Sequence, residues 1–396
     1  MNRLDARAGL LDAIDRRFAA EFGGGGARTF FAPGRINLLG AHLDYNGGDV
    51  LPMAIDRGIF ARARLRRDRR IRLVSLDVAR TVDIDAGEIG AHTRREWGWA
   101  GYPIGVFDGF RRRTGGTAGV EIVFGGDMAM ASGLSSSAAI EVVTGVALDA
   151  LHGTGLPRQE IALIAHAAET GFVGLRCGIM DQFASALAKP GHVLLLHCAG
   201  PTYEHVPFDP QACEILVMDT RKPRQLSKSE FNHRVAEVAA AHEILRAHVR
   251  PLPHLAAYTP ADLERGSTSL SDVLYRRARH VVLEMERVRT GVAALRAHDY
   301  ARLGEQLTAS TASAARDYEV SCDELDVITA AACAQPGVFG ARLTGAGFGG
   351  CAIALVTPGA AAEVAAGVAA AFVARFGIEP GFDVLHIGSG PGEVVR

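Results

Sequence analysis

The best candidate for phosphate chemistry is the run Gly-Leu-Ser-Ser-Ser at residues 133–137. A strand-like run at 120–124 comes before it, and a helix-like run at 138–151 follows without a break. Glycine lets the backbone approach a ligand closely, and the unpaired N–H groups at a helix N-terminus attract anions. We therefore interpret this run as the triphosphate site of a kinase. The alternative is that the serines only cap the helix, a role that suits serine well.

A second polar stretch covers residues 34–48. It places Arg35, His42, Asp44 and Tyr45 among glycines and between two apolar runs. Polar groups packed between apolar segments are typical of a hydrogen-bonding pocket for a small molecule. A long polar turn without a ligand is the alternative.

Two further stretches carry weaker signals. Asp181 stands among apolar neighbours, and because a buried aspartate is rarely unpaired, it is either ion-paired structurally or functional. Residues 340–350 form another glycine-dense turn, which leads into a strand-like run.

Apolar periodicity predicts the elements that must position these residues. Helices are expected at residues 10–22, 104–110, 138–151, 161–171, 184–188, 227–250, 273–297, 300–313 and 324–334, and a last alanine-rich helix ends at Phe376. Strands are expected at residues 29–33, 120–124, 193–196, 215–218, 351–356 and 383–387. Residues 251–271 are expected to be irregular.

Residues 59–65 and 71–73 alternate apolar side chains with arginines, which predicts a β-hairpin with one arginine-rich face. The formal net charge of −2 favours a solvated sheet face over a nucleic-acid surface. The aromatic residues Trp97, Trp99 and Tyr102 are expected to belong to the core.

The composition is that of a globular protein, with 396 residues, 48% hydrophobic and 22% charged. This length favours two domains, which we place at residues 1–205 and 206–396 because proline and glycine interrupt the pattern near the boundary. We expect no membrane span, no nucleic-acid partner, a cytoplasmic location and a monomer or weak homodimer. The six cysteines form no CxxC pair and predict reduced thiols.

Taken in order, these stretches resemble the GHMP kinases, and within that family the galactokinases. The matching segments are GRINLLG at 34–40, GLSSSAA at 133–139, CGIMDQ at 177–182, RHV at 279–281 with Glu284 and Arg287 after it, and LTGAGFGG at 343–350. The resemblance implies an α+β fold with a ribosomal-protein-S5-like N-terminal domain and a ferredoxin-like C-terminal domain. It places the active site in the cleft between them.

The resemblance also implies residue roles in phosphoryl transfer from ATP to the C1 hydroxyl of a sugar. Asp181 and Arg35 would be catalytic, with Asp181 accepting the hydroxyl proton and Arg35 keeping it ionised. Ser137 and Glu169 would hold Mg²⁺, which prefers oxygen ligands. ATP would be bound by Gly133, Leu134, Ser135, Ser136, Ser137, Ala138, Gly345 and Gly347. The sugar would be bound by Ala41, His42, Asp44, Tyr45, Gly178, Asp181 and Phe231.

Three departures leave the acceptor open. Galactokinases usually carry glutamate, which reaches the sugar's C6 hydroxyl, where this chain has Ala41, and tyrosine where it has Phe231. Arg221 adds a charge where neutral residues are common. Galactose is the first candidate, and galacturonate or a related sugar is the alternative, since plant galacturonokinases also show Gly-Ala-His at 40–42. A non-catalytic sensor of galactose and ATP is a third possibility, against which the intact serine run argues.

Overall fold

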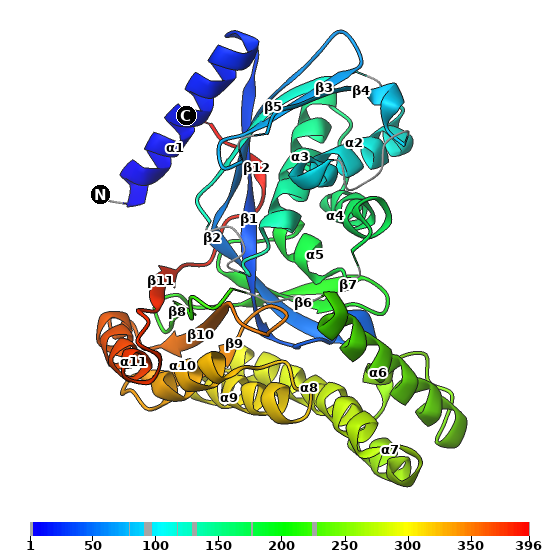
Figure 1. The fold of residues 1–396 in the computed structure, drawn as a ribbon, viewed down its shortest axis with the longest axis vertical. Coiled ribbons are helices and arrows are strands. Elements are labelled where there is room, and N and C mark those ends of the chain that lie inside the picture. The colour runs from blue at the N-terminus through cyan, green and yellow to red at the C-terminus, as the bar shows by residue number, and fades with distance from the viewer. Residues whose placement is uncertain are drawn as a thin grey trace.

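The computed structural model describes residues 3–78, 80–90, 97–116, 118–128, 133–175, 177–223 and 228–395. Two sheets and their helices stack along the long axis of the molecule (Figure 1). The upper part of the view holds an eight-stranded mixed sheet, and the lower part holds a four-stranded antiparallel sheet. This arrangement confirms the predicted α+β class.

The larger sheet is built around two long neighbouring strands, β1 (Arg28–Leu39) and β2 (Asp49–Leu65). Its main path has the order β12-β1-β2-β5-β3-β4, and β6 and β7 extend from one end of β2. The remaining strands are β3 (Arg70–Ser75), β4 (Val82–Asp85), β5 (Val120–Gly126), β6 (His192–His197), β7 (Thr202–Pro207) and β12 (Gly392–Glu393). β12 comes from the end of the chain and pairs with β1 near its start.

Helices cover both faces of this sheet (Figure 1). On one side, α1 (Arg3–Phe22) packs Ile14 and Phe18 into a small core with Phe31 and Phe60. On the other side lie α2 (Gly101–Thr114), α3 (Ser136–His152), α4 (Arg158–Ala167) and α5 (Met180–Ala186). These four helices share the main core with β1 and β2.

The smaller sheet has the order β11-β8-β10-β9. Its strands are β8 (Glu214–Asp219), β9 (Val338–Leu343), β10 (Cys351–Val356) and β11 (Gly381–Leu385). The helices of this half are α6 (Lys228–His248), α7 (Pro260–Arg265), α8 (Asp272–Arg296), α9 (Tyr300–Arg316), α10 (Asp323–Cys333) and α11 (Ala361–Phe376). The long helix α8 lies against α9 and reaches β1, so it connects the smaller layer with the larger sheet.

The predicted hairpin of residues 59–65 and 71–73 is wrong. Both segments are strands, but β5 lies between them, antiparallel to β2 and parallel to β3. A strand distant in sequence therefore takes the position that a hairpin would give to β3.

The arginine-rich face is also not simply solvated, because α1 lies over it. Arg62 pairs with Asp15 of α1 at 3.1 Å, and Arg64 lies over the ring of Phe18. Arg64 and Arg66 both pair with the buried Glu121 of β5. These ion pairs neutralise the charges of Asp15 and Glu121. The contacts of Arg62 and Arg64 with α1 hold this helix on the sheet.

Two other expectations need adjustment. Residues 251–271 contain the short helix α7, which begins with a capping box between Thr259 and Asp262. Strand β1 continues through Gly34 to Leu39, so the first half of the polar stretch at 34–48 is strand and only its second half is turn.

The predicted domain boundary at 205/206 falls inside β7, and the division into two domains stays a prediction.

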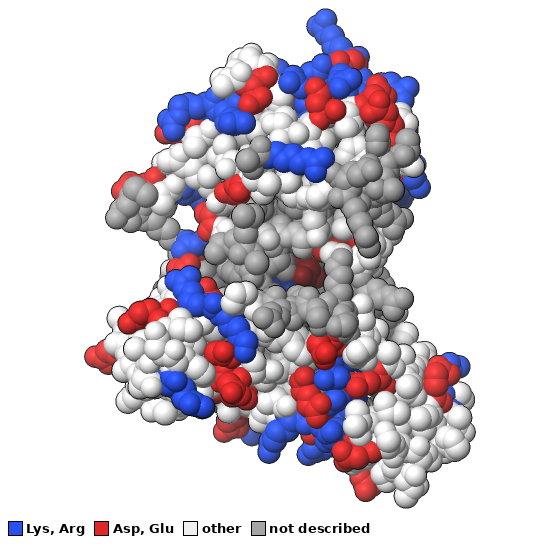
Figure 2. Space-filling view, viewed as in Figure 1, with Lys and Arg blue, Asp and Glu red and all other residues white. Residues whose placement is uncertain are grey.

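Figure 2 shows basic and acidic side chains interspersed over one face, which is hollowed near the middle of the molecule. Acidic atoms are visible at the floor of this hollow. Within the described ranges, the helices that are long enough to cross a membrane are too polar to do so.

Candidate active site

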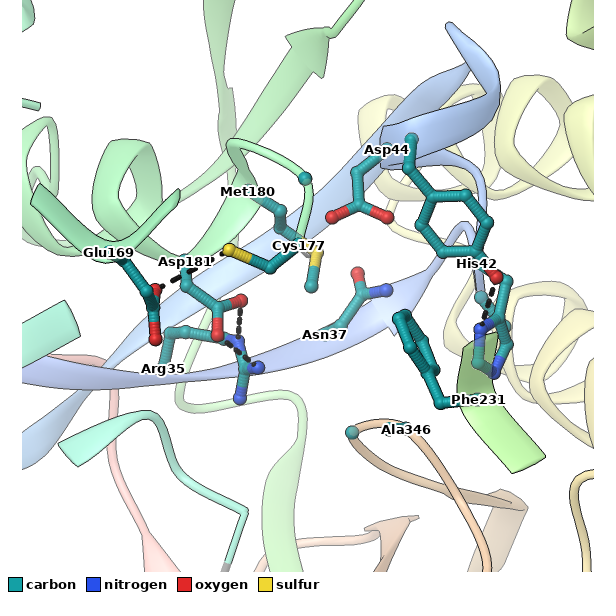
Figure 3. A pocket seen from close by; sticks show the side chains of 14 residues that line it. Arg35, Asn37, His42, Asp44, Glu169, Cys177, Met180, Asp181, Phe231 and Ala346 are labelled. Atoms are coloured by element: carbon teal, nitrogen blue, oxygen red, sulfur yellow. Dashed lines mark hydrogen bonds and ion pairs between the residues drawn. The ribbon is translucent and has the colours of Figure 1, made fainter. Parts of the chain in front are cut away.

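Arg35 and Asp181 form the central ion pair of the site. Arg35 lies on β1, and Asp181 lies in the first turn of α5. Arg35 Nε donates to Asp181 Oδ1 and Arg35 Nη2 to Oδ2, both at 2.7 Å. Such two-point pairs fix the plane of the carboxylate as well as its position. Figure 3 shows this pair beside Glu169 at one end of the cavity.

The serine run contacts this pair directly. Ser135, just before α3, has a left-handed φ of 61° and makes no side-chain capping bond, and its hydroxyl donates to Asp181 Oδ2 instead. Arg35 Nη1 donates to the carbonyl of Gly133 at 2.7 Å. The alternative that the serines only cap a helix therefore does not hold for Ser135. Residues 129–132, which lead into this turn, lie outside the described residues.

Glu169 lies in a buried cluster of carboxylates. Gln182 Nε2 donates to both Glu169 and Glu141, and the Cys177 thiol donates to Glu169 at 3.6 Å. Burial raises the pKa of Glu169, and the nearby charge of Asp181 raises it further. Burial and the charge of Glu169 likewise raise the pKa of Glu141. These acids destabilise one another in their ionised forms, which a bound cation would relieve.

The donor set at this end fits Mg²⁺. Ser137 also hydrogen-bonds Glu169, so a hydroxyl and a carboxylate already lie together. In the described part of the chain no three His, Cys, Asp or Glu side chains are grouped closely enough to form a complete cage. Mg²⁺ is commonly held by one or two protein oxygens together with substrate phosphates. Glu169 and Ser137 are therefore suitable ligands.

Asp44 occupies a different wall of the same cavity and approaches Gly178 closely. A Cβ atom at position 178 would lie 2.0 Å from Asp44 Oδ2, so only glycine fits there. Burial raises the pKa of Asp44 to about 6, with a further contribution from the charge of Asp181. Asp44 is thus an acceptor that ionises close to neutral pH.

Aromatic side chains form the end of the cavity opposite the ion pair. The ring of His42 lies 6.1 Å from Phe231 of α6 and 4.7 Å from Tyr318 (centroid distances). His42 Nδ1 is 2.9 Å from the Tyr45 hydroxyl, which is 2.8 Å from that of Tyr318. Burial lowers the pKa of His42 to about 3, so its imidazole is neutral. Figure 3 shows His42 and Phe231 together on this side.

The structure brings most of the predicted residues into one cavity. Those that line it are Arg35, Ala41, His42, Asp44, Tyr45, Glu169, Gly178, Asp181, Phe231 and Gly345. Its other lining residues, for which the sequence predicts no role, are Asn37, Cys177, Met180 and Ala346. Asn37 follows Arg35 by two positions, and the alternation of a strand could have indicated that the two side chains share a face.

Three of the residues predicted to bind ATP are buried or tightly packed, and their role in binding ATP stays a prediction. Ala138 is fully buried in α3, and Leu134 is buried with its carbonyl accepting from the Arg35 N–H at 3.0 Å. Gly347 packs against Val320, whose carbonyl oxygen would lie 2.1 Å from an added Cβ. Gly347 thereby allows the turn to approach Val320.

Arg221 does not belong to the cavity. It pairs with Asp219 at 3.2 Å and lies against Gly381 of β11. The charge that Arg221 adds is therefore not part of the described lining of this cavity. Among the described residues that line the cavity, the only arginine or lysine is Arg35, which is already paired with Asp181.

A second cavity lies beside the start of α3. It is lined by apolar and aromatic side chains that include Trp99, Tyr102 and Ile140, and by the polar residues Ser75, Asp77, Ser136 and Ser137. The sequence prediction for the aromatic residues is thus only partly right, because Trp97 is buried in the core but Trp99 and Tyr102 face this cavity. A flat apolar group attached to a phosphate at the serine turn would fit here.

Three family models match the chain. The galactokinase galactose-binding signature matches residues 16–65, the GHMP kinase N-terminal domain matches 101–189, and the GHMP kinase C-terminal domain matches 292–374. The first match contains Arg35 and the polar loop after β1, and the second contains the serine turn, Glu169 and Asp181.

Similar proteins span nearly the whole chain. A galactokinase of Exiguobacterium sibiricum is 38% identical over 386 residues, covering 96% of this chain and 97% of the relative. One from Clostridium acetobutylicum is 35% identical over 383 residues, covering 96% and 98%.

Solved structures of GHMP kinases are also similar to this chain over most of its length. The crystal structure of Lactococcus lactis galactokinase complexed with galactose superposes with a TM-score of 0.91 at 35% identity, covering 97% of this chain and all of that one. A mevalonate kinase of Methanococcus jannaschii shares the fold, with a TM-score of 0.67 at 18% identity, covering 92% and 99%. With these near-complete alignments and all three family models, the chain belongs to the GHMP kinases and, within them, to the galactokinases.

Proposed function

We propose that this sugar kinase transfers the γ-phosphoryl group of ATP to the C1 hydroxyl of galactose, in the cytoplasm and as a monomer or weak homodimer. The observation that carries the proposal is the Arg35–Asp181–Ser135 cluster at one end of a cavity whose other end is aromatic. One end has the charges that phosphoryl transfer needs, and the other has the mixed polar and aromatic surface that a sugar ring needs.

Asp181 Oδ1 is the atom that receives the proton of the acceptor hydroxyl. Asp181 Oδ2 accepts two bonds, from Arg35 Nη2 and Ser135 Oγ, whereas Oδ1 accepts one, from Arg35 Nε. A carboxylate oxygen has two lone pairs, so the contacts of the described residues leave one on Oδ1 for a substrate hydroxyl. A weak base is sufficient here because the proton leaves late in a loose transition state.

Arg35 has two tasks in this scheme. It holds the plane of the Asp181 carboxylate, and its charge stabilises the negative charge on the transferred phosphoryl group. Mg²⁺ held by Ser137 and Glu169 would neutralise charge on the ATP phosphates. The second cavity, which shares Ser137 with that site, would take the nucleotide base against Trp99 and Tyr102.

The acceptor is proposed to be galactose because the described cavity residues offer no free cation for a carboxylate at C6. Ala41 remains the one observation in favour of galacturonate. A panel of galactose, galacturonate and glucose in an assay of ADP release distinguishes these acceptors. Galactose is expected to give the highest kcat/KM, and a higher value for galacturonate would replace it as the substrate.

Asp181→Asn tests the catalytic assignment. The amide keeps the shape of the side chain but cannot take up the proton, so kcat is expected to fall by about a thousandfold or more. Binding of ATP, followed by the fluorescence of Trp99, should remain within a few-fold of that of the unaltered protein. Asp272→Asn, at an exposed aspartate in the first turn of α8, is the matched control and should leave kcat unchanged. A near-normal kcat for Asp181→Asn would contradict the assignment.

A further inference from the structure

The loop that follows β1 enters the sugar cavity in a conformation that needs support. Ala41 and His42 both line the cavity, and His42 has a left-handed φ of 60°. A residue with a side chain is disfavoured in this region and keeps the conformation only where its surroundings impose it.

Glu284 of α8 binds the backbone of this loop. Its Oε1 atom accepts from the backbone N–H groups of Gly40 at 3.0 Å and Ala41 at 3.1 Å. The same oxygen accepts from Ser310 at 2.7 Å, and Oε2 accepts from Arg287 at 2.7 Å. The carboxylate is completely buried, and its partners therefore fix it in one position.

His280 of α8 contacts the other backbone polar group of Ala41. Its Nε2 atom lies 3.1 Å from the carbonyl oxygen of Ala41. A carbonyl only accepts, so Nε2 carries a hydrogen and donates to it. His280 and Glu284 are four positions apart on α8 and therefore share one face of the helix. Both backbone groups of Ala41 are thus bound by neighbouring side chains of α8.

Tyr318 and Arg342 make further contacts with the residues on either side of Ala41. The ring of Tyr318 packs against His280, with a centroid distance of 4.6 Å, and also against His42, at 4.7 Å. Buried Arg342 of β9 donates to the carbonyl oxygens of Asn37 and Leu38 at 3.1 and 2.9 Å. Backbone from the end of β1 to His42 is therefore held by side chains from the second half of the chain.

We propose that His280 and Glu284 are positioning residues for the acceptor sugar, which act by holding the Ala41 backbone and thereby the orientation of His42 and Asp44. These two residues lie in the α8 segment at 279–287, whose sequence resembles the family although the segment does not line the cavity. The hydrogen bonds to Gly40 and Ala41 give this segment a physical role. The inference rests on the proposed function only in taking the acceptor sugar as the occupant of the cavity.

The test variant is His280→Phe. It keeps an aromatic ring beside Tyr318 but leaves the buried carbonyl of Ala41 without its donor, so the loop is expected to lose its single conformation. The Kd for galactose, measured by calorimetry without ATP, should rise about tenfold or more, and the KM for galactose should rise in parallel. The KM for ATP should stay within twofold, because the partners of His280 in the described part of the chain belong neither to residues 133–137 nor to the lining of the second cavity.

Two companion variants separate positioning from general stability. Val281→Ala, at a fully buried neighbour on α8, should lower the Tm without weakening galactose binding more than twofold. His280→Gln carries an amide nitrogen that can reach the position of Nε2, and it should restore most of the affinity. If His280→Phe does not fold, His280→Met replaces it, since its flexible side chain fills the space without a donor.

The outcomes are distinct. If the donor-less variant weakens galactose binding no more than Val281→Ala does, or weakens ATP and galactose equally, the inference is overturned. If the unaltered protein binds galactose but shows no sugar-dependent ADP release, the proposed function fails while the positioning role can still be judged from the Kd values.

Discussion

Asp44 shows how burial can adjust a single side chain for binding. Its carboxylate is enclosed by the loop after β1 and by Gly178, and burial raises its pKa from the usual 3.8 of an aspartate to about 6. The folded protein therefore holds a proton at Asp44 between about pH 4 and about pH 6, whereas the unfolded chain does not. Since the unfolded state binds fewer protons in this window, ionisation of Asp44 lowers stability as the pH rises.

The same ionisation should improve sugar binding, because an ionised carboxylate is the stronger acceptor for a sugar hydroxyl. We expect the KM for galactose to rise as the pH falls from about 7 to about 5, which brackets this pKa of about 6. Steady-state kinetics across this range measure the effect.

Asp44→Asn should bind galactose more weakly and should lose this pH dependence. A KM that varies equally with pH in the asparagine variant would show that another group is responsible. His42 is an unsuitable alternative, since burial lowers its pKa to about 3, outside the range tested.

At the scale of residues, the sequence predicts which residues form the site better than it predicts the hydrogen bonds between them. Arg35 and Asp181 belong to segments that can be recognised, the resemblance implies Glu169, and the structure brings the three together. The bond from Ser135 to Asp181 and the bonds from His280 and Glu284 to Ala41 join segments that are far apart in the chain. No periodicity or motif contains the distances on which such contacts depend.

At the scale of elements, α9 and β9 approach each other so closely that their backbones touch. A Cβ atom at Gly304 of α9 would lie 2.1 Å from the carbonyl oxygen of Phe339, and one at Gly340 of β9 would lie 2.0 Å from that of Gly304. A helix and a strand can come this near only when both positions lack a side chain. The packing of this layer therefore depends on two glycines.

Gly304→Ala should force α9 away from β9 and lower the free energy of unfolding by about 1–3 kcal/mol or more, as overpacking does. Gly9→Ala is the matched control, because Gly9 also lies inside a helix but has open space around its Cα. The control should gain about 0.5–1 kcal/mol from the better helix propensity of alanine. Urea unfolding of both variants measures the difference, and equal effects would contradict the close contact.

Helices were predicted more successfully than strand neighbours. The periodic segments at 138–151 and 273–297 match α3 and α8 closely, because an amphipathic helix is defined by local spacing. The partner of a strand is not local, and β5 therefore separates β2 from β3 although these two are consecutive in the chain. The partial burial of Arg62 and Arg64 under α1 was missed for the same reason.

At the scale of the whole molecule, the two halves of the chain are interlaced. β12 at the end of the chain pairs Glu393 with Phe30 and Gly392 with Phe31 of β1, and the side chain of Glu393 pairs with Arg28. Ile387 bridges to Ile55 of β2 on the way. The end of the chain thus returns to the sheet that its beginning forms (Figure 1).

Removal of residues 389–396 should lower the Tm by several degrees, because an edge of the larger sheet loses its strand and Arg28 loses its partner. Arg28→Ala separates these contributions. The ion pair is about 40% exposed on both sides, so this variant should cost only about 0–1 kcal/mol. Thermal unfolding of the two variants measures them, and a truncated protein as stable as the full chain would show that β12 adds nothing.

The return of β12 to β1 has a consequence for synthesis. Strand β1 is synthesised several hundred residues before its outer neighbour β12. The edge of the larger sheet at Phe30 and Phe31 therefore stays open, with unpaired backbone groups, until β12 has been synthesised. Nascent chains are exposed at this edge to pairing with other strands, and the larger sheet can be completed only after β12 has been synthesised.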